Sequence, residues 1–102
     1  MKLTNYIGGR WQDGNGAGIV LSDPVTGTTL ATASSDGIDI AAGLAHALGV
    51  GGSALRALSY GERAALLGRI AEVLGSHRDD YFRISRQNSG ATEGDAAFDV
   101  DG

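Results

Sequence analysis

A helix-start signal followed by an apolar stripe constrains the middle of the chain more than any other feature. Ser59 precedes Glu62 by three residues, the spacing of a capping box in which each side chain accepts a hydrogen bond from the backbone at the helix start. This spacing predicts a helix that begins at Tyr60. Large aliphatic residues then recur at steps of three and four, the period of one helix face. They are Leu66, Leu67, Ile70, Val73 and Leu74. We expect this face to be buried.

A second helical segment should follow the first directly. Gly75 and Ser76 interrupt the stripe, and the next helical pattern starts within residues 77–80. Asn88, Ser89 and Gly90 form a stop signal, because glycine often follows the last residue of a helix. The sequence therefore predicts two helices in series.

The first third of the chain has the pattern of two β-hairpins. Residues 6–7 and 10–12 flank Gly8 and Gly9, a pair suited to a tight two-residue turn. Residues 19–22 and 28–33 enclose the segment Asp-Pro-Val-Thr-Gly, in which proline fixes φ and glycine permits the exit. Both hairpins are expected to precede all of the helices.

Between the hairpins and the stripe we expect one more helix and a short turn. Asp36 is the predicted cap of a helix across residues 38–48. A glycine cluster should end this helix, and Ser53 should cap a short turn that carries Leu55 and Leu58. The glycines of the cluster are Gly49, Gly51 and Gly52.

Composition argues against independent stability. The chain has 102 residues, of which 42% are hydrophobic and seventeen are glycine. A domain of this size buries only about 60 to 70% of its unfolded surface. Glycines within helical patterns, such as Gly43, Gly61 and Gly68, cost roughly 1 kcal/mol each relative to alanine. We expect aggregation or partial order if the chain is separated from a larger protein.

Two groups of residues invite a functional interpretation that their context does not favour. The segment Gly14–Gly18 superficially suggests a phosphate-binding loop, but such a loop follows a strand and opens a helix, whereas this one precedes a strand. We interpret it as a flexible connection between hairpins. Asp95, Asp99 and Asp101 lack the alternate spacing and the distal glutamate of a calcium loop. A solvated acidic segment is the preferred interpretation.

The remaining candidates are single side chains without partners. His46 and His77 are expected at packing or surface positions, because no ligand spacing surrounds them. Ser59 lacks the glycines of a nucleophile elbow, and its capping role accounts for it. We therefore predict no catalytic, cofactor-binding or metal-binding residue within the chain.

Charge and hydropathy exclude other classes of partner. The formal net charge is −4, which disfavours nucleic-acid binding. No run approaches the roughly 18 apolar residues of a membrane span, and Met1–Asn5 lacks the apolar region of a secretory signal. With no cysteine to suggest an oxidising compartment, we expect a cytoplasmic protein without membrane contact.

Three passages in order resemble the aldehyde dehydrogenase superfamily. The segment Asn5–Trp11 resembles its opening hairpin, Asp23–Gly27 resembles its asparagine-proline turn, and Ala54–Gly90 resembles its first helices. A narrower resemblance is to the semialdehyde dehydrogenases that act on CoA-linked intermediates of bacterial phenylacetate and benzoate degradation. Four passages suggest it, at residues 35–42, 51–60, 88–90 and 95–102.

The resemblance implies an α/β fold, the N-terminal part of a Rossmann-like cofactor domain with two β-hairpins followed by consecutive helices. Residues 1–34 would form a β-hairpin arm, residues 35–102 would belong to the NAD(P)-binding domain, and the catalytic domain would be absent. The family oxidises aldehydes with a cysteine thiolate that forms a thiohemiacetal and yields hydride to NAD or NADP. No position here matches that cysteine or the cofactor-binding residues.

The resemblance also implies a partner and an assembly. The substrate would be an aldehyde, possibly CoA-linked, and the enzyme would be a homodimer or a higher homo-oligomer. An N-terminal portion of a longer, active enzyme is thus the first hypothesis. A non-catalytic interaction or oligomerisation module, or a truncated remnant, is the alternative. A continuation of the reading frame that encodes a cysteine would favour the first.

Overall fold

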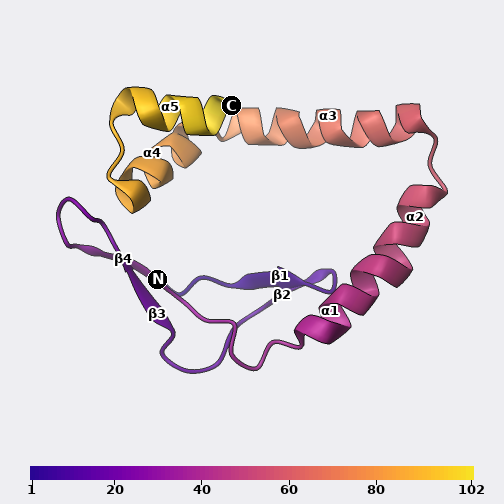
Figure 1. The fold of residues 1–102 in the computed structure, drawn as a ribbon, viewed down its shortest axis with the longest axis horizontal. Coiled ribbons are helices and arrows are strands. Elements are labelled where there is room, and N and C mark those ends of the chain that lie inside the picture. Colours follow the sequence, from indigo (N-terminus) through magenta and orange to yellow (C-terminus); the bar gives the residue numbers. More distant parts are fainter.

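The computed structural model describes all residues, 1–102, as two β-hairpins followed by a series of helices (Figure 1). The strands are β1 (Asn5–Ile7), β2 (Arg10–Gln12), β3 (Ile19–Ser22) and β4 (Thr29–Ala33). The helices are α1 (Ile40–His46), the π-helical segment η1 (Ala47–Gly51), α2 (Gly52–Arg56), α3 (Tyr60–Ser76), α4 (Arg78–Ser89) and α5 (Glu93–Asp101). The predicted order of hairpins and helices is confirmed, and the fold is mixed α/β.

Both predicted hairpins are present as separate two-stranded antiparallel sheets. Gly8 and Gly9 have φ angles of 61° and 78°, the left-handed values that a tight turn between β1 and β2 requires. Tyr6 lies opposite Trp11, with ring centroids 5.1 Å apart in an edge-on arrangement. In the second hairpin, the Asp23 carboxylate closes the turn between β3 and β4 by accepting a hydrogen bond from the Val25 N–H group at 2.8 Å.

The segment after the hairpins differs from the sequence prediction. Asp39, not Asp36, caps the first helix, because its carboxylate accepts a hydrogen bond from the Ala42 N–H group at 2.8 Å. The glycine cluster at 49–52 does not end the helix, which continues as the π-helical η1 and then α2. Gly51 and Gly52 take right-handed helical angles there, so backbone hydrogen bonding prevails over their low helix propensity. Ser53 consequently lies inside α2 and caps nothing.

The two predicted helices in series are confirmed as α3 and α4. Ser59 Oγ accepts a hydrogen bond from the Glu62 N–H group at 3.2 Å, and Glu62 Oε2 accepts one from the Ser59 N–H group at 2.7 Å. The complete capping box therefore starts α3 at Tyr60. Gly90 follows α4 with a φ of 69°, the left-handed cap that the stop signal predicts.

Removing the capping hydroxyl should loosen the start of α3. We expect Ser59→Ala to lower the opening free energy of the first turn by about 1 kcal/mol, because the Glu62 N–H group loses its acceptor. Amide hydrogen exchange at Glu62 measures this change. Ser53→Ala is the matched control, since Ser53 lies within a helix and caps no backbone group. Equal exchange in the two variants would contradict a capping role.

The acidic end of the chain forms a helix, α5, in place of the expected solvated segment. Thr92 accepts a hydrogen bond from the Asp95 N–H group at 3.3 Å and thereby caps α5. Helix α5 packs on α4, and Ala96 is fully buried. The interpretation of this region as a solvated acidic segment is therefore only partly right, because Asp101 forms an ion pair with Arg78 of α4.

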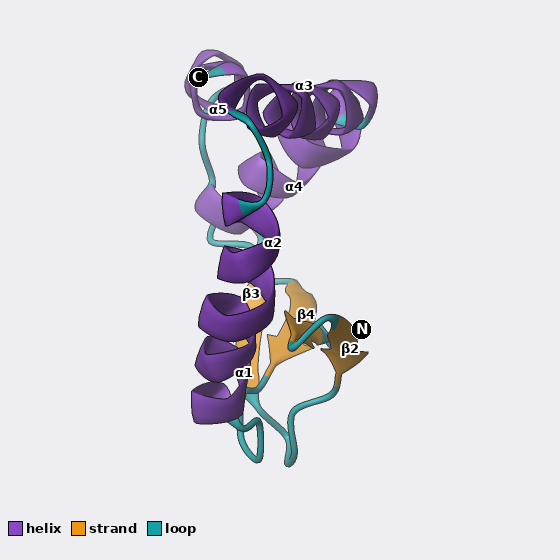
Figure 2. Ribbon diagram, turned by 90° about the vertical axis from the view of Figure 1, so that its right-hand side faces the viewer, coloured by secondary structure: helices purple, strands orange, loops and turns teal.

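The elements follow one another around an open ring instead of enclosing a core (Figure 1). The radius of gyration is 17.1 Å, whereas a compact domain of 100 residues has about 13 Å. Only three of the 102 residues are buried, and the molecule is 16 Å thick along its shortest axis. Figure 2 shows the strands and α1 in the lower half of the molecule, and α3, α4 and α5 in the upper half. The packing that would stabilise a free domain is absent from this chain.

Candidate functional site

The glycine-rich segment 14–18 is a packed connection between β2 and β3. Lys2 Nζ donates hydrogen bonds to the carbonyl oxygens of Gly14 at 2.5 Å and Gly16 at 3.2 Å. Ser34 Oγ donates to the carbonyl oxygen of Asn15 at 2.7 Å. The loop thus presents carbonyl oxygens to a cation, the opposite polarity to a loop that cradles phosphate with N–H groups. The segment connects the two hairpins, as predicted, and its hydrogen bonds to Lys2 and Ser34 hold it in place. These residues do not fit the pyrophosphate of a nicotinamide cofactor.

The histidines and the acidic residues are not brought together. His77 lies at the junction of α3 and α4, as expected, with its ring edge-on to Tyr81 at a centroid distance of 6.3 Å. His46 ends α1 and faces the first hairpin. No group of three or more histidine, cysteine, aspartate or glutamate side chains is placed to hold a metal ion.

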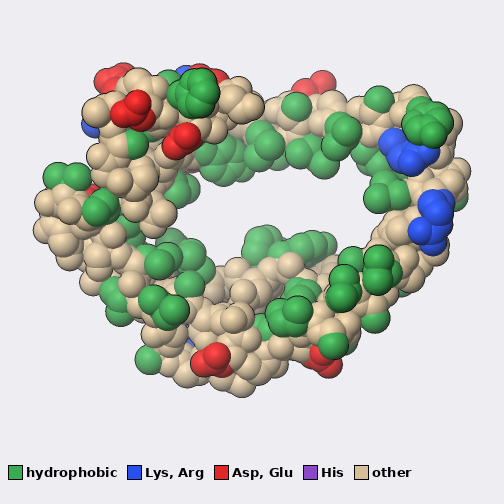
Figure 3. All heavy atoms as spheres, viewed as in Figure 1, with side chains coloured by type: hydrophobic (Ala, Val, Ile, Leu, Met, Phe, Trp, Pro, Cys, Tyr) green, Lys and Arg blue, Asp and Glu red, His purple; other side chains and the backbone are tan.

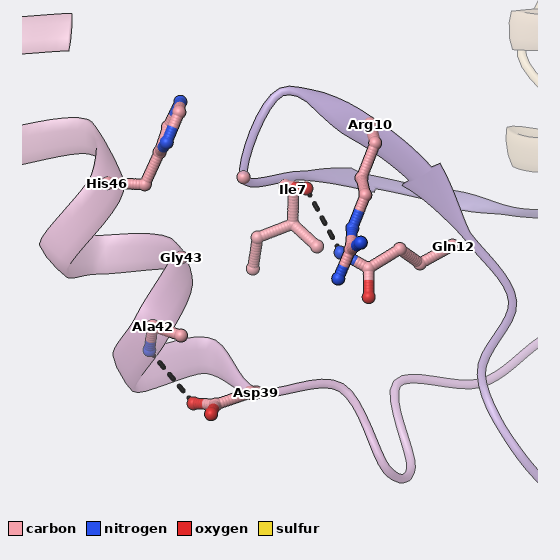
Figure 4. Close-up of a pocket in the computed structure, with 8 residues that line it drawn as sticks. Ile7, Arg10, Gln12, Asp39, Ala42, Gly43 and His46 are labelled. Carbon is pink, nitrogen blue, oxygen red and sulfur yellow. Dashed lines mark hydrogen bonds between the residues drawn. The ribbon is translucent and has the colours of Figure 1, made fainter. Parts of the chain in front are cut away.

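A polar pocket lies between the first hairpin and α1 (Figure 4). Its volume is about 290 Å³, and the hairpin contributes Ile7, Arg10 and Gln12 while α1 and its cap contribute Asp39 and His46. Gly43 lets the hairpin approach, because a Cβ atom at this position would overlap the Ile7 side chain. The pocket is therefore formed by the close contact of a hairpin with a helix.

The polar groups of this pocket already serve local structure. Gln12 Nε2 donates to the Ile7 carbonyl oxygen at 3.1 Å, and the Asp39 carboxylate caps α1. Aldehyde oxidation through a covalent intermediate requires a nucleophile beside a base, and neither cysteine nor serine lines the pocket. The sequence alone does not predict this pocket, because its residues come from segments about thirty positions apart, which no local motif connects.

The apolar stripe of α3 is not covered by any other part of the structure. We use the name inner face for Leu66, Leu67, Ile70, Val73 and Leu74. No residue of this 17-residue helix is buried, and Ile70 is 55% exposed. Four of these residues line a shallow groove of about 300 Å³ whose only charged neighbour is Arg69. The predicted face is present, but the prediction that it is buried is wrong for this chain, because no other element covers it (Figure 3).

The electrostatic contacts secure the ends of helices and turns. The Asp23 carboxylate has a lowered pKa because backbone N–H groups of Thr26 and Val25 donate to it. The pKa of Glu62 is lowered by the backbone hydrogen bond from Ser59. Arg78 Nε and Nη2 donate to the two carboxylate oxygens of Asp101 at 2.6 and 2.7 Å. This bidentate pair lowers the pKa of Asp101 and raises that of Arg78.

The contact between α4 and α5 should depend on pH through Asp101. Its pKa is lowered from 3.8 in the folded chain, so the stabilisation is complete above 3.8 and is lost as the pH falls through the folded value. An NMR titration of the carboxyl group measures this pKa. Arg78→Gln should return it toward 3.8, whereas Arg83→Gln, which removes the partner of Asp80, should not change it. An Asp101 titration unaffected by Arg78→Gln would contradict the assignment.

The structure contains no helix of the length and apolar character that crossing a membrane requires. No family model matches the chain. The chain is similar over its whole length to a curated dehydrogenase, with 60% identity over 102 residues. That relative is the 3,4-dehydroadipyl-CoA semialdehyde dehydrogenase of Aromatoleum evansii, and the chain spans 20% of its length. The resemblance to CoA-linked semialdehyde dehydrogenases is confirmed by this identity.

Proposed function

We propose that the chain is the N-terminal part of an NAD(P)-dependent aldehyde dehydrogenase that oxidises a CoA-linked semialdehyde to the acid. The identity of 60% across all 102 residues carries the proposal, because it extends through both hairpins and every helix. The name of the relative supplies the substrate class, a semialdehyde attached to CoA.

Within such an enzyme this chain supplies structure and no reacting group. The family reaction needs a cysteine thiolate, and the chain contains no cysteine. The glycine loop does not fit the cofactor, since its carbonyl oxygens are engaged by Lys2. Residues outside the chain would therefore bind NAD or NADP and perform the chemistry. In this proposal, residues 1–34 form a β-hairpin arm. Residues 35–102 form a helical segment of a Rossmann-like NAD(P)-binding domain.

The family resemblance extends the proposal to assembly and location. The enzyme would be a cytoplasmic homodimer or higher homo-oligomer that binds neither nucleic acid nor membrane. The alternative is a non-catalytic interaction or oligomerisation module, which the exposed apolar side chains of α3 favour. The two functions differ in whether the chain supports catalysis when it is joined to the remaining part of a dehydrogenase.

A chimera tests the proposed function. In it, this chain replaces the matching fifth of the Aromatoleum evansii dehydrogenase. We expect aldehyde-dependent reduction of NAD or NADP within roughly tenfold of the parent rate, since no reacting group changes and tenfold corresponds to about 1.4 kcal/mol in the barrier. The separate chain should reduce neither cofactor. A folded but inactive chimera would contradict the proposal, and self-association of the separate chain would then support the alternative.

A further inference from the structure

The connection between the two hairpins contains a reactive pair that the proposed function does not use, Asn15 followed by Gly16. Asparagine is a thermolabile residue, because the next backbone nitrogen can attack its side-chain amide. Glycine offers the least hindered nitrogen for this attack, since it has no Cβ atom. The other two asparagines, Asn5 and Asn88, precede tyrosine and serine.

The reacting groups of this pair are free in the structure. Asn15 is exposed, and the structure gives its side-chain amide no hydrogen bond. Gly16 lies outside every helix and strand, and its N–H group donates no hydrogen bond to the backbone. Its φ of 70° places it in the left-handed region that glycine adopts readily. Neither the electrophile nor the nucleophile therefore has to leave a partner before they meet.

The other asparagines are held in regular structure. Asn5 lies in β1, and its Nδ2 atom donates a hydrogen bond to the Ser34 carbonyl oxygen at 2.9 Å. Asn88 lies within α4, so the nitrogen of Ser89 cannot turn toward its side chain unless the last helical turn unwinds. The structure thus concentrates this reactivity at one asparagine of the three.

Lys2 and Ser34 bind the backbone on both sides of the reactive pair. Lys2 Nζ donates to the carbonyl oxygens of Gly14 and Gly16, and Ser34 Oγ donates to that of Asn15 at 2.7 Å. Ring closure turns the peptide plane between Asn15 and Gly16, so the contact with Ser34 opposes it. Lys2 bridges the reactive residue and is sensitive to any change in backbone length there.

The Lys2 contact also anchors the N-terminal segment, residues 1–3, to β4. The Thr32 N–H group donates to the Met1 carbonyl oxygen at 2.9 Å, and the Leu3 N–H group donates to the Thr32 carbonyl oxygen at 2.8 Å. Lys2 lies opposite Thr32 in this parallel pairing. The segment is therefore fixed by β4 on one side and by the connection between the hairpins on the other.

We propose that Asn15 is a site of spontaneous covalent modification that releases the N-terminal segment from β4. The Gly16 nitrogen bonds to Asn15 Cγ, the Cγ–Nδ2 bond breaks, and the amide nitrogen leaves as ammonia with the Gly16 proton. Water then opens the succinimide to an aspartyl or an isoaspartyl residue, without oxidation or reduction. The isoaspartyl product has an extra backbone atom between the two carbonyl groups that Lys2 binds, so Lys2 cannot hold both.

Peptide mapping by mass spectrometry, after incubation near neutral pH, tests the modification. The separate chain and the chimera are both suitable, because all the contacts described lie within residues 1–36. Asn15 should convert at least roughly tenfold faster than Asn5 or Asn88, a difference of about 1.4 kcal/mol in the barrier. Equal rates would overturn the proposal. An aspartyl product without its isoaspartyl isomer would also overturn it, since opening of a succinimide gives both.

Three variants assign the conversion to the ring-closing route. Asn15→Gln keeps the amide but requires a larger ring, so conversion should stop while the backbone sequence around it is unchanged. Gly16→Ala should slow conversion, because a Cβ atom hinders the attacking nitrogen. Ser34→Ala should accelerate it, since the Asn15 carbonyl group turns more easily without its donor. Conversion at position 15 that proceeds equally in Asn15→Gln would contradict the route, even if Gly16→Ala failed to fold.

Amide hydrogen exchange tests the release of the N-terminal segment. In the purified isoaspartyl form, the amides of Leu3 and Thr32 should exchange at least roughly tenfold faster than in the unmodified protein. Asn15→Asp has the same charge without the extra backbone atom and should keep the protection. Equal exchange in the isoaspartyl and unmodified forms would refute the release. Neither readout involves aldehyde oxidation, so an inactive chimera would count against the proposed function alone.

Discussion

Replacing Gly18 by alanine is expected to lower the free energy of unfolding of the chimera by roughly 2–5 kcal/mol. Gly18 has a φ of 71°, a left-handed conformation that costs an alanine about 1–2 kcal/mol. Its new Cβ atom would also overlap the carbonyl oxygen of Ala33 and lie 2.8 Å from the carbonyl carbon. The backbone of β4 would have to move, so the connection between the two hairpins would loosen.

Gly27→Ala is the matched control for this variant. Gly27 has a φ of 73°, but a Cβ atom there would meet no other atom within 4 Å. The control therefore carries the conformational penalty without the overlap. Thermal unfolding of both variants separates the two contributions. If Gly27→Ala is as destabilising as Gly18→Ala, the close approach of Gly18 to Ala33 contributes nothing.

Gly90→Ala should destabilise the chimera by roughly 1–3 kcal/mol, at the contact between the second hairpin and the helices. Gly90 ends α4 with a φ of 69°, and a Cβ atom would lie 3.0 Å from Pro24 Cγ and 3.3 Å from Val25 Cγ2. The proline ring is rigid, so it yields little to the added methyl group. The hairpin turn would be displaced from the end of α4.

Gly8→Ala provides the comparison, since Gly8 has a φ of 61° and no neighbour within 4 Å of its Cβ position. We expect Gly90→Ala to lower the thermal midpoint further than Gly8→Ala does. Amide hydrogen exchange should show the added loss of protection in the turn near Pro24. Equal midpoints would contradict a close contact between Gly90 and the turn of the second hairpin.

Local signals account for the parts of the fold that were predicted correctly. The capping box of Ser59 and Glu62, the glycine pair at 8–9 and the stop at Gly90 each act within a few residues, so the sequence contains the whole interaction. The start of α1 at Ile40 also has a local signal, because Asp39 caps it. Asp36, the predicted cap, lies three residues too early. The pair Thr92 and Asp95 had the spacing of a cap and would have revealed α5.

Features that run against local propensity, or that depend on distant segments, could not be predicted in this way. The glycine cluster at 49–52 has low helix propensity, yet continuous backbone hydrogen bonds carry the helix through it. The pocket beside His46 forms because Ile7 lies against Gly43, a contact that spans 36 positions (43 − 7). The inner face was predicted from its period alone, but its place on the rim of an opening follows only from the arrangement of all the elements.

The exposed fraction of Ile70 in a crystal structure of the chimera tests the central claim most directly. In the separate chain, this side chain is 55% exposed. If the chain is the N-terminal part of an aldehyde dehydrogenase, Ile70 and its neighbours on the inner face will be buried against residues of the Aromatoleum evansii portion. An inner face that remains in solvent in the folded chimera would contradict the account.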